Sequence, residues 1–535
     1  MNKFFLFILT ILLVMAFMVS GCSNPTPTTT TPAATTPVET TPAITTVTPK
    51  YGGTLIIQYG AEMNQPGDPR DDSAMALAFR YCAVENLARI NASDELYPYL
   101  ADSWSSDAAA KTVTVKLKEG IQFQDGTPFN ADAVKFTWGL YQAAKRPEIS
   151  NIASVEILDD YTLQVNLTQW DNSIFIKILN TCGTIISPTA WEKNGDDAKN
   201  IPVGTGPFKF VTWTPNVGGK FVKWDGYWQK DKGYPYVDAI EYKNIADLTT
   251  ASAALMAGEV DMIENVVDPL VAKNLSTAPD IVLTIDKSGI ESATFALHPD
   301  LGVEGVTTIY DDINIRKAVA YAIDTESIVK NFTYGFSETT NQWCMKNNWA
   351  YSPNVKGYPY DPVKAKELLA DAGYPDGFET SIMCFSDMQN FAEAIQGMLA
   401  DVGIKATIRG LAPPAMYEFI IKGGWEGLRL TPERCNGNVP YRMSVYLATG
   451  AFEGIGLYHS AELDQMFQDA LAATDFQTQQ ERAWEINEFV YDTQCALIPM
   501  YVNYGINAKR PYVKDDHFCT SGASFWTPEQ VWLDK

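Results

Sequence analysis

Apolar and polar positions along most of the chain repeat with the periods of short strands and helices. Residues 112–117 alternate between apolar and polar side chains, as a strand with one buried face does. Asn130 stands where a helix cap belongs, and Val134, Trp138 and Tyr141 follow it at helical spacing. This stretch therefore predicts a strand followed by an amphipathic helix.

The same two periods recur over the rest of the chain and predict a mixed α/β protein. Strands are expected at residues 51–57, 155–167 (as a hairpin), 293–297, 404–408 and 497–501. Helices are expected at residues 73–90, 187–192, 315–323, 361–372, 391–402, 461–472 and 475–491. Residues 255–263 predict the end of a helix, a cap at Gly258 and a short buried strand.

The N-terminal segment has the pattern of an export signal. Lys3 provides a positive charge, and residues 4–19 are apolar apart from Thr10, a run too short for a typical membrane span. Residues 19–22 (VSGC) are typical of a bacterial lipobox, which makes Cys22 the predicted lipidation site. The alternative is an ordinary secretory signal that happens to contain this cysteine.

A segment dominated by Thr and Pro follows the predicted signal, at residues 24–49. Such a segment has too little apolar bulk to offset the entropy lost on ordering, so we expect an extended stalk. At a polyproline rise of about 3.1 Å per residue it would reach on the order of 80 Å. We therefore predict a lipoprotein signal peptide at residues 1–21 and a lipidated linker at residues 22–50.

Composition and motifs exclude several classes of function. The chain has 40 Lys and Arg against 64 Asp and Glu, a net charge of −24, which argues against nucleic acid and against docking on anionic lipid. No HExxH, GxSxG or P-loop motif is present, and three His without a CxxC pair argue against a zinc cluster. Acidic pairs such as Asp71-Asp72 fall in loop-like positions. We predict no enzyme, no metal and no cofactor.

A series of motifs between residues 52 and 509 carries a family resemblance. They include LADSW (100–104), LKEGIQFQDGTPF (117–129), GTGPFKF (204–210), LMAGEVDMI (255–263) and YDPVKAKELLADAGYPDGF (360–378). In this order they resemble family 5 extracellular solute-binding proteins, which include the oligopeptide, dipeptide and nickel receptors of ABC importers. The glycines of GTGPFKF are not followed by a nucleotide-binding GxGxxG unit, so we expect them to return the backbone to a sheet.

The resemblance implies a two-lobed α/β fold of the periplasmic-binding-protein type, with a hinge and the extra subdomain of the large peptide receptors. The expected boundaries are lobe I at 51–72, 200–290 and 506–535, the extra subdomain at 73–199, and lobe II at 291–505. Cys82 and Cys182 would then share a domain, which makes them the favoured pair for a disulfide in an exported protein. Seven cysteines besides Cys22 leave at least one thiol unpaired within the chain.

A receptor that closes two lobes on a solute needs stacking surfaces and a few polar groups in its cleft. The candidate ligand-binding residues are Asn64, Gln65, Trp343, Trp349, Trp425, Arg429, Arg434 and Asn436. A single Trp is more often part of a core than of a binding site. Trp343 is favoured because it falls in a loop and not on an apolar stripe.

The segment at residues 427–436 departs from the family pattern. Peptide-binding members have an Asp here that pairs with the α-amino group of the ligand, whereas this chain offers Arg429 and Arg434, with Glu433 as the only acid. A guanidinium suits a carboxylate or another acceptor through forked hydrogen bonds. Either arginine serves equally well as the partner of a neighbouring acid.

Together these features predict a lipid-anchored extracytoplasmic receptor of an ABC importer. Its partners would be a small solute, the permease subunits with their ATPases, and the membrane through the lipid anchor; we expect a monomer. Peptide is the expected ligand, oligosaccharide is the alternative, and nickel is disfavoured by the scarcity of His. A surface hydrolase and an adhesion or sensor protein are the competing classes.

Overall fold

The computed structural model describes residues 48–535, apart from 61–62, 72, 92–94, 288–292, 303–305, 423–424, 435–436, 452–453 and 518–525. The predicted signal peptide, the stalk up to residue 47, the lipidation site Cys22 and the candidate Asn436 lie outside the described residues. Across the described part of the chain, no helix is long and apolar enough to cross a membrane.

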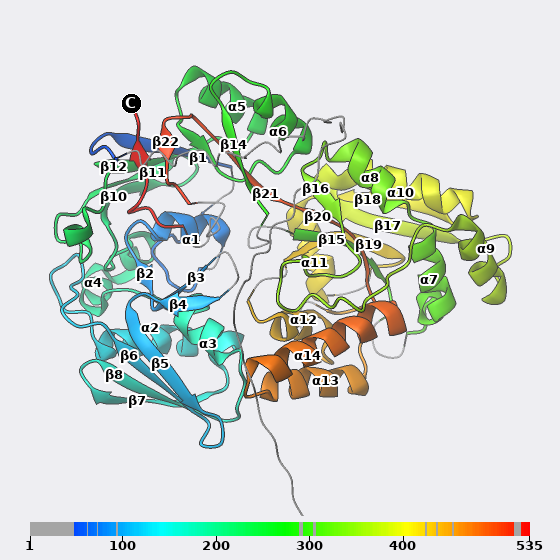
Figure 1. Cartoon of the computed structure of the whole chain (residues 1–535), viewed down its shortest axis with the longest axis horizontal. Helices are drawn as coiled ribbons and strands as arrows, with labels where there is room; N and C mark the ends of the chain where they lie inside the picture. Colours follow the sequence, from blue (N-terminus) through cyan, green and yellow to red (C-terminus); the bar gives the residue numbers. More distant parts are fainter. Residues whose placement is uncertain are drawn as a thin grey trace, which may run out of the picture. The chain divides into compact units, whose positions relative to one another are not determined.

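Lobe I is built on a seven-stranded sheet in the order β10-β11-β12-β1-β13-β21-β14 (Figure 1). Its strands are β1 (Thr54–Tyr59), β10 (Phe208–Thr214), β11 (Gly218–Lys223), β12 (Ala239–Asn244), β13 (Met262–Ile263), β14 (Val282–Asp286) and β21 (Gly505–Lys509). The helices are α1 (Ala74–Arg80), α5 (Leu248–Ala257) and α6 (Pro269–Ser276). The central strand β1 runs parallel to both of its neighbours, β12 and β13.

A separate four-stranded antiparallel sheet, in the order β5-β6-β8-β7, forms an additional subdomain. It consists of β5 (Ala101–Asp107), β6 (Thr112–Leu117), β7 (Ile152–Asp159) and β8 (Thr162–Leu167). Helix α2 (Ala131–Ala143) covers one face, because Val113 and Val115 of β6 share a buried apolar cluster with Val134 and Trp138 of α2. The short elements around it are β2 (Glu85–Asn86), β3 (Ala88–Ile90), β4 (Leu96–Pro98), α3 (Ile174–Ile176), β9 (Thr184–Ile185) and α4 (Pro188–Asn194).

Lobe II contains a six-stranded sheet in the order β16-β20-β15-β19-β17-β18. Its strands are β15 (Ala293–Pro299), β16 (Ser337–Thr339), β17 (Glu379–Phe385), β18 (Lys405–Leu411), β19 (Leu428–Arg434) and β20 (Ile498–Asn503). Its helices are α7 (Ile313–Tyr321), α8 (Thr325–Phe332), α9 (Pro362–Asp371), α10 (Gln389–Asp401), α11 (Pro413–Lys422), α12 (Val439–Leu447), α13 (Ala461–Ala472) and α14 (Phe476–Asn487).

Two different cores flank the six-stranded sheet, so its strands are buried on both faces. Leu297, Leu428 and Leu430 pack with α7, α9 and α10 on one side. Met383 and the helices α11 to α14 form the second core with the loop that carries Trp343. A strand buried on both sides reads as a nearly continuous apolar run, so any polar residue in it requires an explanation.

The chain passes between the two large sheets twice. Residues 287–292 lead from β14 in lobe I to β15 in lobe II, and the single residue Tyr504 leads from β20 back to β21. Short connections between separately packed sheets are the usual structural basis of a hinge. The fold is therefore the two-lobed α/β fold of the periplasmic binding proteins.

Most of the predicted elements are confirmed. The strand at Thr112–Leu117 and the helix at Ala461–Ala472 have the predicted bounds, and the Asn130 side chain accepts a hydrogen bond from the Ala133 amide as a helix cap. Gly204 and Gly206 lead into β10 as expected. Their backbones lie so close to Ala83 that an added Cβ would fall 2.6 Å from its backbone atoms.

The predicted helix at residues 73–90 is wrong in its second half, because α1 ends at Arg80 and residues 85–90 form β2 and β3. Residues 81–90 are buried on every side, so the apolar run that resembles a helical stripe belongs to two short strands. The Arg80 side chain donates hydrogen bonds to the carbonyls of Asp68 and Asp71, which fixes the chain where the helix ends.

The predicted disulfide between Cys82 and Cys182 is also wrong. Both residues are buried as thiols, and they belong to different apolar clusters. Cys82 lies in the lobe I core, 3.9 Å from the Tyr242 hydroxyl, and burial raises the pKa of its thiol. Cys182 lies in the core of the additional subdomain.

Candidate functional site

A row of polar side chains crosses the middle of the lobe II sheet on the face that carries the second core. The register of β15 and β19 places Thr294 opposite Glu433, Ala296 opposite Thr431, and His298 opposite Arg429. All six are buried, at 0 to 6% exposure. We call Thr294, His298, Arg429, Thr431 and Glu433 the buried polar cluster.

Glu433 is the centre of this cluster. Its Oε1 atom accepts a hydrogen bond from the Thr431 hydroxyl at 3.1 Å and lies 3.4 Å from Nε2 of His298. The same oxygen lies 4.0 Å from Nη2 of Arg429. One carboxylate oxygen thus lies close to both a guanidinium and an imidazole.

Burial changes the protonation of the cluster. It raises the pKa of Glu433, and the positive charge of Arg429 opposes this shift. Burial, together with the same guanidinium, holds the pKa of His298 well below its usual range. With one cation and one anion already present, a protonated His298 would add an uncompensated buried charge. His298 is therefore neutral at pH 7.

Two tryptophans border the cluster. The Arg429 guanidinium lies 5.3 Å from the ring centre of Trp425, a cation–π contact. The Thr294 hydroxyl donates to the Trp343 carbonyl at 2.6 Å, and the Trp343 ring meets Tyr446 edge to face. Both indoles are 3% exposed, and neither indole N–H has an acceptor among the described residues. The cluster thus offers unused donors beside a buried cation.

The structure brings some of the predicted site residues together and leaves others apart. Trp343, Trp425 and Arg429 meet at the buried polar cluster. Asn64 and Gln65 are exposed in the loop after β1.

Trp349 packs on Phe476 of α14, and its carbonyl accepts a hydrogen bond from Gln480. The backbone of Arg434 belongs to β19, and its side chain lies outside the described part. Ligand contact remains a prediction for all of the proposed residues.

His298 and Thr294 were not among the predicted site residues. A signal was present: the run ATFALHP places Thr294, Ala296 and His298 on one side of a strand whose other side is apolar. His298 is one of only three histidines in the chain, and a histidine in the interior of a strand is unusual at a core position. Their partners on β19 could not be found locally, because they lie more than 130 residues further along the chain.

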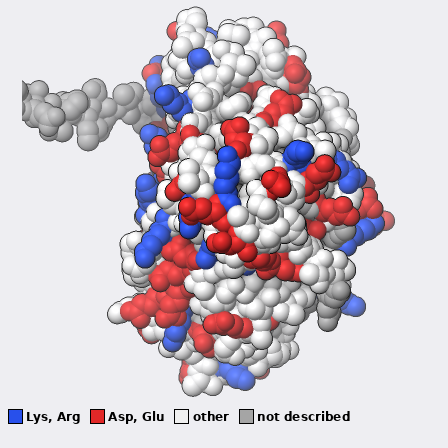
Figure 2. Space-filling view, turned by 90° about the vertical axis from the view of Figure 1, so that its right-hand side faces the viewer, with Lys and Arg blue, Asp and Glu red and all other residues white. Residues whose placement is uncertain are grey.

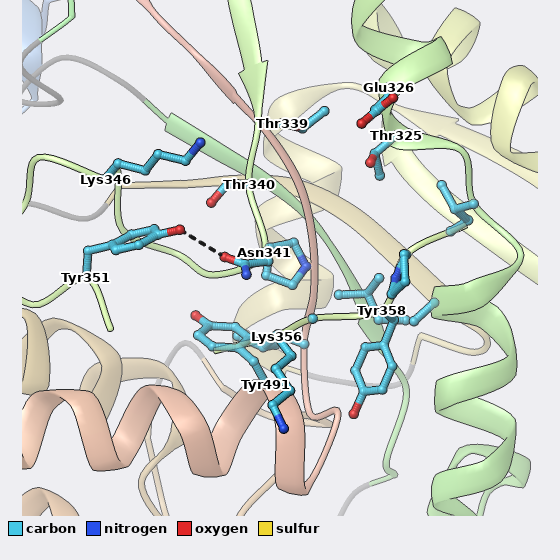
Figure 3. A pocket seen from close by; sticks show the side chains of 17 residues that line it. Thr325, Glu326, Thr339, Thr340, Asn341, Lys346, Tyr351, Lys356, Tyr358 and Tyr491 are labelled. Carbon is cyan, nitrogen blue, oxygen red and sulfur yellow. Dashed lines mark hydrogen bonds between the residues drawn. The ribbon is translucent and has the colours of Figure 1, made fainter. Parts of the chain in front are cut away.

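A cavity of about 360 Å³ lies on the other side of the loop that carries Trp343. Figure 3 shows its polar lining, with Lys346 above Tyr351 and the Tyr351 hydroxyl directed at Asn341, 3.4 Å from its Oδ1 atom. Tyr491 connects this cavity to the cluster, because it lines the cavity and its hydroxyl accepts from the Trp343 amide at 3.0 Å. The cavity is large enough for a small solute.

The surface fits a protein that avoids polyanions. Figure 2 shows Asp and Glu side chains in extended patches over the face in view, with Lys and Arg scattered between them. Within the described ranges, no group of three or more His, Cys, Asp or Glu side chains is arranged to hold a metal ion. The most distinctive chemistry of lobe II is therefore the buried polar cluster.

Comparison with known proteins identifies the class. The chain matches the family described as bacterial extracellular solute-binding proteins, family 5 Middle, over residues 95–427. The glutathione-binding protein GsiB of Escherichia coli (strain K12) is 35% identical over 377 residues, 67% of this chain and 69% of GsiB.

Two solved structures show the same fold. The periplasmic binding protein DppA from Helicobacter pylori, in complex with the peptide STSA, has a TM-score of 0.76 at 22% identity and covers 91% of this chain and 99% of DppA. AgaA from A. tumefaciens R10, in complex with agropinic acid, has a TM-score of 0.74 at 22% identity and covers 90% of this chain and 99% of AgaA.

The protein is thus a two-lobed extracytoplasmic solute-binding receptor of the kind that serves ABC importers, and not an enzyme. It belongs to family 5 of the bacterial extracellular solute-binding proteins.

Proposed function

We propose that this receptor binds a short peptide or a peptide-like acid, with a ligand carboxylate held by Arg429. The observation that carries the proposal is a fully buried guanidinium on β19, which lies 4.0 Å from Glu433, an acid whose pKa is raised by burial. A carboxylate that pairs with such a cation forms a charge-assisted hydrogen bond, worth about 1.5–3 kcal/mol.

The relatives support an acidic ligand. GsiB is named for glutathione, DppA was solved with a peptide and AgaA with agropinic acid. Peptides carry a terminal carboxylate, and agropinic acid is an acid by name. The family Asp that pairs with a ligand amine is absent from residues 427–434 of this chain, so a free α-amino group would not find its usual partner. An oligosaccharide stacked on Trp343 and Trp425 is the alternative.

The test is a thermal-shift screen followed by calorimetry. Glutathione, N-acetylated dipeptides, unblocked dipeptides and neutral oligosaccharides form the panel. A ligand at one hundred times its Kd should stabilise the folded protein by about 2.7 kcal/mol. We expect the acidic and N-blocked compounds to bind and simple unblocked dipeptides to bind weakly.

Matched variants locate the bound carboxylate. Arg429→Met should raise the Kd by about 10- to 100-fold. The double variant Arg429→Met/Glu433→Gln controls for the cost of leaving one buried charge behind. Lys346→Met removes a cation from the cavity of Figure 3 and should leave the Kd unchanged. Loss of binding in Lys346→Met alone would place the ligand in the cavity and contradict the role of Arg429.

We further propose that Cys22 carries the lipid anchor and that the protein presents its closed form to permease subunits with their ATPases. The proposed boundaries are those given above, with lobe I at 51–72, 200–290 and 506–535, the extra subdomain at 73–199 and lobe II at 291–505. Helix α1, at the start of the 73–199 segment, packs into the core of lobe I. Cys22→Ala should move the protein from the membrane fraction to the soluble fraction. Limited proteolysis should cut between residues 24 and 50 and leave the rest intact. A Cys22→Ala protein that still carries a mature lipid anchor would contradict this assignment.

A further inference from the structure

The C-terminus of α13 in lobe II is bound by a residue from the additional subdomain. Nδ2 of Asn172 donates hydrogen bonds to the carbonyls of Ala470, at 2.8 Å, and Ala473, at 3.1 Å. The backbone amide of Asn172 donates to the Leu471 carbonyl at 2.9 Å. A residue about 300 positions earlier in the chain therefore satisfies three carbonyl acceptors at the end of this helix.

The last turn of any α-helix leaves carbonyl groups without partners inside the helix. Many helices satisfy them through a residue in the left-handed conformation, usually glycine, but the C-cap residue of α13, Ala473, has φ −57° and ψ 136°. In the described structure of this segment, the backbone amide of the C-cap residue donates no hydrogen bond to these carbonyls. Asn172 thus performs for α13 the capping that a local residue performs elsewhere.

The acceptor of the same side chain is used as well. Oδ1 of Asn172 accepts from Nδ2 of Asn438 at 2.8 Å and from Nε2 of Gln479 at 3.4 Å. The neighbouring Trp170 indole donates to the Ala473 carbonyl at 3.4 Å. One asparagine therefore contacts α12, α13 and α14 together, through its backbone amide and both polar atoms of its side chain.

The turn that presents Asn172 is itself fixed. Oδ1 of Asp171 accepts from the amide and the hydroxyl of Ser173, and Oδ2 accepts from Lys177 at 2.6 Å. The Lys177 ammonium lies 4.0 Å from the ring centre of Tyr441 on α12, which is a second contact across the same boundary. Rigid presentation reduces the entropy lost when the contact forms.

We propose that Asn172 is a positioning residue that stabilises the closed arrangement of the two lobes, already in the ligand-free protein, and so sets ligand affinity without touching the ligand. Trp170 and Ile174 beside it belong to the core of the additional subdomain, whereas α12 to α14 belong to the second core of lobe II. Opening of the lobes must break these bonds and expose the end of α13. Apparent affinity scales with the population of the binding-competent state. The proposal rests on the receptor class and not on the ligand chemistry proposed above.

The experiment compares the ligand-free wild type with Asn172→Ala. We expect Asn172→Ala to have a larger radius of gyration in small-angle X-ray scattering and about tenfold faster hydrogen exchange at the amide of residue 172. Asn172→Asp keeps the size of the side chain but loses both donors, and its carboxylate faces the carbonyl end of a helix, so it should open at least as far.

Asn166→Ala is the matched control. Asn166 lies in the same subdomain, and its side chain donates to Ser154 and Glu156 of β7 within that sheet. The Asn166→Ala variant should have the same radius of gyration and the same hydrogen-exchange rate at residue 172 as the wild type. Identical scattering and exchange in wild type and Asn172→Ala would overturn the proposal, and so would an equal change in Asn166→Ala.

Ligand kinetics provide a second readout. If glutathione binds, Asn172→Ala should raise its Kd about tenfold through a faster dissociation rate, with the association rate unchanged. The scattering and exchange measurements need no ligand, so a failure of the ligand assignment leaves them decisive.

Discussion

The neutral buried histidine of the polar cluster makes a prediction about stability that needs no ligand. His298 is 1% exposed, and burial beside Arg429 holds its pKa well below the usual value. In the unfolded chain a histidine has a pKa of about 6.5. Between the folded and the unfolded pKa the unfolded chain binds more protons, so stability falls as the pH falls below about 6.5.

The magnitude follows from this linkage. While His298 stays neutral in the folded protein, each pH unit below 6.5 costs about 1.4 kcal/mol, so the loss between pH 7 and pH 5 is about 2 kcal/mol. His298→Gln cannot be protonated and should lose this dependence. The variant itself should be less stable at pH 8 by about 1–3 kcal/mol, because it alters a buried contact with Glu433.

The assay is urea unfolding of wild type and His298→Gln at pH 5, 6, 7 and 8, followed by circular dichroism. The quantity of interest is the difference in unfolding free energy between the two proteins, because carboxylates such as Glu85, whose pKa is raised by burial, titrate in both. The unfolding free energy of the wild type should fall steadily relative to that of His298→Gln below pH 6.5. A difference in unfolding free energy that does not change with pH would refute the neutral state of His298. A wild type that becomes more stable than the variant on acidification would mean that a charged His298 pairs with Glu433.

Two further predictions concern packing. Gly204→Ala should destabilise the protein by about 1–3 kcal/mol in urea unfolding, because the new Cβ would lie 2.6 Å from the Ala83 carbonyl oxygen. Gly139→Ala is its control, since no atom lies within 4 Å of the added Cβ in α2, and it should stabilise by about 0.5–1 kcal/mol; equal effects would contradict the close approach. Iodoacetamide should leave Cys82, Cys384 and Cys495 unmodified in the native protein and alkylate all three after unfolding, as read by mass spectrometry. All three are buried, and burial raises the pKa of Cys384 to about 11 and that of Cys495 to about 12. Rapid labelling of any of them in the native state would show that this part of the core opens.

Local patterns determined much of this protein. The alternation of Val113, Val115 and Leu117 fixes a strand face, and Asn130 and Asp361 begin helices with their own side chains. These features depend on a few neighbouring residues, so sequence alone reveals them. The ordered motifs gave the two-lobed fold in the same way, because each is a short run with its own turn and cap chemistry.

Only the tertiary structure decided the chemistry of the site and of the lobe contact. Whether Arg429 meets an acid, a histidine or a ligand depends on the register of β19 against β15, and a shift of one residue would turn every side chain to the opposite face. Asn172 reads locally as a loop residue, and its role appears only where Ala470 and Ala473 meet it. The helix predicted over residues 81–90 was wrong for the same reason, because these residues are buried on all sides and their apolar run is not a helical stripe. Contacts between distant segments are set by the packing of whole elements, and no local period records them.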